Sequence, residues 1–168
     1  MITSQRLLIS AISGVAAIML LLNLIQAQER APDPTSAERS PVKPKPALSP
    51  EQVVLIQLNA MASNDIPTKD AGIALVYNFA SPANRIQTGP LPRFKRMIHD
   101  GYQVMLNHTN AQLGTLQHED SHAAVNVFLV ASDGRRVGFR FFLSKQTEGD
   151  HRGCWMTDAV IPIEAEII

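Results

Sequence analysis

The chain has 168 residues, and its 15 lysines and arginines balance its 15 aspartates and glutamates at a formal net charge of zero. This balance argues against the basic surface of proteins that bind nucleic acids, so we expect no nucleic-acid partner. Cys154 is the single cysteine, which excludes an intramolecular disulfide and a multi-cysteine zinc site. We predict no metal and no cofactor.

The chain begins with an apolar segment directed to a membrane. Residues 7–25 carry no charge and match the length of a bilayer span, whereas the apolar part of a cleaved signal peptide is only about 7–15 residues long. Because Ala27 offers a small residue for cleavage, residues 1–27 are a signal anchor or a signal peptide. Residues 28–48 are rich in proline and predict a disordered tether, which leaves residues 49–168 as the folded domain.

The sequence gives less direct evidence for the side of the membrane on which the domain lies than for the membrane segment itself. Arg6 precedes the apolar segment, and a strict count of the cations after it would place the tether in the cytoplasm. Acidic residues are interspersed among those cations, and a short basic start is usual for exported proteins. We therefore predict a membrane-anchored or secreted domain on the non-cytoplasmic, periplasmic-type side.

The first part of the domain has the pattern of three helices. Ser49-Pro50-Glu51-Gln52 forms a capping box with proline at the first helical position. A second helix is predicted from Ala71 to Ala80, ended by Ser81-Pro82, and a third from Pro92 to His99. The apolar face of the first helix is predicted to contain Val54, Leu55, Leu58, Met61 and Ala62.

Beyond residue 104 the pattern changes to antiparallel strands. Asp133-Gly134 favours a two-residue hairpin turn. The resulting pairs on the helix-facing side are Val130–Val137, Phe128–Phe139, Asn126–Phe141 and Ala124–Leu143. The other side, with Val125, Val127, Leu129 and Phe142, would also be apolar, which predicts that another copy covers it in a homodimer.

The last strand is predicted within GCWMTDAVIPI, after a turn at Glu148-Gly149. That turn would direct Cys154, Met156 and Asp158 toward the helices, and Trp155 and Thr157 away from them. A change of one residue in loop length would invert this assignment.

Helices followed by a curved antiparallel sheet make an α+β domain with the element order of the nuclear transport factor 2-like cone fold. The stretches SPEQVVLIQLNAMASND, DAGIALVYNFASPANRIQTGPLPRFKRM and GCWMTDAV resemble the domain-of-unknown-function family numbered 4864, over about residues 49–163. This resemblance implies the cone fold and no established activity. Relatives of the fold include isomerases, cyclases, dehydratases and binding subunits, so the fold does not decide the function.

Four residues are candidates for a pocket in the cone: Asp158, Asn126, Tyr77 and Arg85. In the predicted register Phe128, Phe139 and Met156 would surround Asp158 and raise its pKa. Asp158 could act as a general base or ligand-orienting group, or be a structural aspartate that bonds Asn126, Thr157 or a helix end. Tyr77 could direct its hydroxyl into the cone or be a core residue. Arg85, in a segment predicted to be irregular, could hold a ligand's carboxylate or phosphate. The basic run Arg93, Lys95 and Arg96 is interpreted as a solvated helix face.

Two further features resemble reactive sites. His118 and His122 have helical metal-ligand spacing, but they bridge two predicted strands, so we interpret the segment as a polar turn. Cys154 has no histidine aimed at it and is interpreted as a small buried side chain. We therefore predict a binding module for a small amphipathic ligand or a protein partner; the alternative is an isomerase, cyclase or dehydratase with Asp158 as base. Whether the cone is open or filled is left open.

Overall fold

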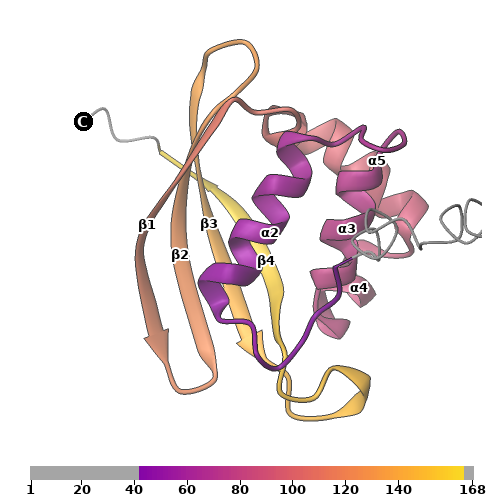
Figure 1. Cartoon of the computed structure of the whole chain (residues 1–168), viewed down its shortest axis with the longest axis vertical. Helices are drawn as coiled ribbons and strands as arrows, with labels where there is room; N and C mark the ends of the chain where they lie inside the picture. Colours follow the sequence, from indigo (N-terminus) through magenta and orange to yellow (C-terminus); the bar gives the residue numbers. More distant parts are fainter. Residues whose placement is uncertain (1–41, 165–168) are drawn as a thin grey trace, which may run out of the picture. The chain divides into compact units, whose positions relative to one another are not determined.

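The computed structural model describes residues 42–164, an α+β domain with four α-helices and a four-stranded antiparallel sheet. The helices are α2 (Pro50–Ala62), α3 (Ala71–Phe79), α4 (Pro82–Thr88) and α5 (Leu91–Gly101), and the strands are β1 (Asn110–Glu119), β2 (His122–Val130), β3 (Arg136–Lys145) and β4 (Trp155–Ile163). All four helices lie on one side of the sheet, whose strand order is β1-β2-β3-β4 (Figure 1). Within residues 42–164 no helix is long and apolar enough to cross a membrane, and the predicted membrane segment lies outside them.

The start of α2 confirms the predicted capping box. The Ser49 hydroxyl accepts a hydrogen bond from the Gln52 amide at 3.3 Å, and the Gln52 side chain accepts one from the Ser49 amide at 2.9 Å. Val54, Leu58 and Met61 are buried as predicted, but Leu55 is 43% exposed. Its assignment to the buried face was wrong, because Leu55 lies outside the stripe of buried residues that runs along α2 through Val54, Leu58 and Met61.

Helix α4 was missed in the sequence, where Ser81-Pro82 was interpreted only as the end of a helix. The Ser81 hydroxyl accepts a hydrogen bond from the Asn84 amide at 3.2 Å, and Pro82 occupies the first turn. Serine followed by proline suits a helix start as well as it ends the preceding helix. The segment predicted to be irregular is therefore helical.

The hairpin between β2 and β3 differs from the prediction by one residue. The Ala131 amide bonds the Arg135 carbonyl and the Gly134 amide bonds the Ala131 carbonyl, each at 2.9 Å, so the loop has three residues. Gly134 has φ 85°, the left-handed conformation that three-residue hairpin loops require at this place. Val127 consequently pairs with Phe139 and Asn126 with Arg140.

The shift reverses which side chains of β2 face the helices but does not change which side chains of β3 do so. Val125, Val127 and Leu129 are buried toward the helices, while Asn126 and Phe128 lie on the outer face. These three buried residues were the main reason for expecting a second copy on the outer face, and that argument no longer has their support.

The register of β4 also differs. Leu143 pairs with Thr157 and Phe142 with Ala159, so Asp158 is the extra residue of a β-bulge. Trp155 and Thr157 are on the helix-facing side, opposite to the prediction. The reason is the loop before β4, which contains the 3₁₀ helix Gly149–His151 rather than a two-residue turn.

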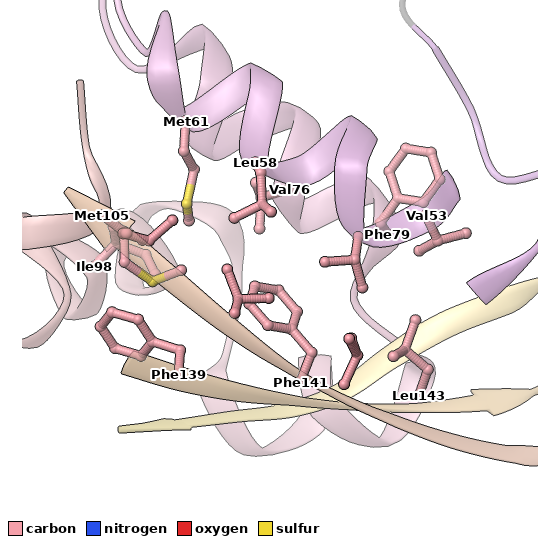
Figure 2. Packing of buried hydrophobic residues seen from close by; sticks show 14 of the residues in the cluster. Val53, Leu58, Met61, Val76, Phe79, Ile98, Met105, Phe139, Phe141 and Leu143 are labelled. Carbon is pink, nitrogen blue, oxygen red and sulfur yellow. The ribbon is translucent and has the colours of Figure 1, made fainter. Parts of the chain in front are cut away.

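The core lies between the helices and the inner face of the sheet. Figure 2 shows Leu58 and Met61 of α2 pointing toward the sheet, and Phe141 and Leu143 of β3 pointing toward the helices. Leu48, at the end of the predicted tether, also packs against this core. The apolar core therefore occupies the space between the helices and the sheet.

Candidate functional site

A partly enclosed cavity of about 170 Å³ remains beside the core. Its walls come from α2, α3, α4, α5 and β4, with Phe141 of β3 and Met105 of the 3₁₀ helix Gln103–Met105. Most of the side chains that line it are apolar, among them Met61, Val76, Phe94, Ile98 and Val160. The interior is therefore neither completely filled nor widely open.

A buried polar pair forms one wall of the cavity. Gln57 of α2 is 1% exposed and Thr157 of β4 is 3% exposed. The Gln57 Nε2 atom lies 2.8 Å from the Thr157 hydroxyl, which in turn lies 3.2 Å from Gln57 Oε1, and Nε2 also donates to the Val53 carbonyl at 3.1 Å. These bonds join the first helix to the last strand and orient the strand where it lines the cavity.

The start of α4 closes the free edge of β4. The Thr157 carbonyl accepts hydrogen bonds from the Ser81 amide at 2.9 Å and from the Asn84 side chain at 3.0 Å. Thr88, one turn after Asn84, donates its hydroxyl to the Asn84 carbonyl at 2.8 Å. Asn84 and Thr88 both line the cavity, so α4 supplies its polar side.

Asp158 is the one candidate of the four predicted pocket residues that lines this cavity. It is half-buried, carries the only carboxylate of the lining and occupies the bulge of β4. It also borders a shallow groove of about 630 Å³ that includes His122, Ala124 and Phe142. The predicted packing of Asp158 among Phe128 and Phe139 was wrong, because the register differs.

Tyr77 and Arg85 hold the helices together beside the cavity. The Tyr77 hydroxyl donates to the Gly89 carbonyl at 3.3 Å, and its ring packs on Phe94 with centroids 5.2 Å apart. Arg85 donates to the Tyr77 carbonyl at 3.2 Å and to the Asn78 carbonyl at 2.8 Å, and it lies 5.0 Å over the Tyr77 ring. Arg85 thus satisfies the last carbonyls of α3, as cations near helix ends often do.

Asn126, the fourth predicted pocket residue, lies on the far side of the sheet. It pairs with Arg140 on the outer face, away from the helices. The structure therefore does not bring the four predicted residues together.

The basic run on α5 divides into two parts. Lys95 lies 3.5 Å from Asp70, which also contacts His99 at 2.9 Å. Burial acts to raise the pKa of Asp70, but the hydrogen bonds from His99 and Asn64 and the charge of Lys95 outweigh it and lower the pKa. Arg93 and Arg96 instead face a second hollow, a groove of about 580 Å³ that shares Gln87, Thr88 and Met97 with the cavity.

The two features that resembled reactive sites have structural roles. Glu119 pairs with His122 and His118 with Ala123, so the two histidines point to opposite faces of the hairpin, and Asp120 and Ser121 form the predicted turn. Residues 42–164 contain no cluster of three metal-binding side chains. Burial raises the pKa of the Cys154 thiol, which keeps it in the unreactive protonated form.

Gln57, Asn84 and Thr157 were not recognised in the sequence. The signal for Gln57 was a polar residue directly beside Leu58 on the apolar side of α2, and such a residue needs a buried partner. Its partner lies 100 residues away in the sequence, so pairing the two required the register of β4.

The model of the family described as Domain of unknown function (DUF4864) matches residues 46–166. This match confirms the resemblance found in the three sequence stretches. No curated protein matches the chain. Because the match covers most of its length, the chain belongs to the DUF4864 family.

Proposed function

We propose that the domain is a binding module that holds a small, mainly apolar ligand in the cavity between the helices and β4. The observation that carries this proposal is the cavity of about 170 Å³, with an apolar lining and polar groups on two sides. A dry apolar cavity of about 150 Å³ is enough to bind benzene. The cavity therefore suits one ring or a short alkyl chain.

The proposed architecture is the nuclear transport factor 2-like cone. It is supported by the order of helices before strands and by the position of all four helices on one side of the antiparallel sheet. We further propose that the domain acts outside the cytoplasm, tethered or secreted. An alkaline phosphatase fusion after Ala47 tests this: activity is expected, and an inactive fusion beside an active cytoplasmic reporter contradicts export.

Ligand binding is tested with the full-length chain, purified without refolding. Native mass spectrometry should show an added small-molecule mass, and Val76→Phe should remove it, because the larger ring enters the cavity lining. Leu55→Phe, at an exposed position of α2, is the matched control and should retain the mass. A chain without added mass that also fails to bind small aromatic probes contradicts the proposal.

A second candidate function is catalysis with Asp158 as general base. The observation that favours it is the place of Asp158 at a β-bulge on the cavity wall, since bulges near active sites commonly redirect a side chain. Once a ligand is identified, Asp158→Asn separates the two functions. Loss of turnover with binding retained supports an enzyme, whereas a ligand that is recovered chemically unchanged supports the binding module.

A further inference from the structure

We infer that the ligand is a small amphipathic carboxylate whose head group is bound by Arg93 and Arg96 while its apolar part occupies the cavity. This inference rests on the proposed binding function and adds the chemical class of the ligand. It starts from the two hollows, which are continuous in their lining: Gln87, Thr88 and Met97 belong to both. A molecule in the cavity can therefore extend along α4 and α5 into the groove.

The groove presents two cations that form no ion pair within the described part of the chain. Arg93 and Arg96 are three residues apart on α5 and so lie on the same side of the helix. Neither is within ion-pair distance of a carboxylate among residues 42–164, in contrast to Lys95 on the same helix. Both arginines are exposed, so a ligand can reach them.

Gly89 lets one of these arginines lie close to the rim. It joins α4 to α5 with φ 78°, and a Cβ atom added there would be 2.7 Å from the Arg93 Cδ atom. The absence of a side chain at this position therefore allows the stem of Arg93 to pack against the chain beside the cavity. Glycine suits this position because it adopts a positive φ without strain and because it leaves room for the Arg93 side chain.

The charges of the groove favour a monoanion. Asp100 lines the groove together with the two arginines, which leaves one net positive charge, and Asp158 is on the β4 wall of the cavity. A carboxylate carries one negative charge and matches the planar fork of an arginine, whereas a phosphate would carry more charge than the groove compensates. The ring-sized cavity limits the apolar part to one ring or a short chain.

Phenylacetate and its neutral isostere phenylacetamide test the inference by calorimetric titration of the full-length chain. Phenylacetate should bind more tightly by about tenfold, the difference expected for a charge-assisted hydrogen bond over a neutral one. Arg93→Gln and Arg96→Gln should remove that preference and leave phenylacetamide binding unchanged. Arg136→Gln, at an exposed position of β3, is the control and should alter neither affinity.

The possible results separate the two proposals. If both probes bind equally and the arginine variants change nothing, the cavity is a binding site but the carboxylate inference is wrong. If the cationic analogue 2-phenylethylammonium binds best, Asp158 and Asp100 select the ligand and the inference is overturned. If no probe binds and the purified chain carries no added mass, the proposed function itself fails.

Discussion

The buried pair of Gln57 and Thr157 makes a quantitative test of how the site is held together. Thr157→Val keeps the shape of the side chain but removes a hydroxyl that accepts a hydrogen bond from Gln57 Nε2 and donates one to Gln57 Oε1. An unsatisfied buried polar group costs about 1–3 kcal/mol, so we expect a loss of about 2 kcal/mol in the free energy of unfolding. Gln57→Met leaves the Thr157 hydroxyl without its partner and should cost about the same.

The double variant distinguishes a coupled pair from two independent side chains. With both polar groups gone no unsatisfied group remains, so the double variant should lose less than about 1 kcal/mol rather than the sum of about 4 kcal/mol. Urea denaturation of the full-length chain, followed by far-ultraviolet circular dichroism, measures all four free energies. Thr115→Val, at an exposed position of β1, is the control and should change stability by less than about 0.5 kcal/mol. Strictly additive losses would refute the coupling and show that water in the cavity hydrates each partner separately.

Three more predictions follow from single residues. Gly72→Ala should destabilise the domain by about 3 kcal/mol in the same assay, because the added Cβ would lie 2.1 Å from a carbonyl oxygen of α2, whereas Gly101→Ala meets nothing within 4 Å and should be neutral or stabilising. The fold lowers the pKa of Asp70 from 3.8, so ionised Asp70 stabilises the folded state above that pH, and this stabilisation is lost as the pH falls through the folded pKa. Asp70→Asn should therefore flatten the decrease in stability below about pH 4, and an unchanged profile would contradict this. Arg85→Met should lower the free energy of unfolding by about 1 kcal/mol, because the hydrogen bonds at the end of α3 are lost. It should leave phenylacetate affinity unchanged, and weaker binding would show that Arg85 contributes to the site.

The helices could be predicted from the sequence because their signals are local. The Ser49 capping box and the apolar spacing of α2 depend on residues within one or two turns, and both are confirmed. Helix α4 has a similar start at Ser81-Pro82, but the same two residues also end α3. A short helix directly after another one was therefore hidden, and with it the role of Asn84 in closing the edge of β4.

The sheet shows why a correct turn residue is not enough to predict a face. Asp133-Gly134 does occupy the β2–β3 turn, but only Gly134 has a positive φ, so the loop has three residues and not two. A register shift of one residue moves every side chain of β2 to the other face, because successive residues of a strand point to opposite sides. The predicted register had placed Asn126 in the site, whereas the observed register puts Asn126 on the outer face and Val127 in the core.

The site itself depends on features that only the folded chain brings together. The bulge of β4 puts Asp158 and Thr157 on the same stretch of cavity wall, and Gln57 holds that stretch from a helix formed 100 residues earlier. The basic run on α5 looked uniform in the sequence, yet Asp70 neutralises Lys95 and leaves the two arginines to the groove. If the proposed binding function is correct, we expect ligand affinity to depend less on which residues are charged than on which charges the fold has already paired. Mutations of Lys95 should act on stability, and those of Arg93 and Arg96 on affinity.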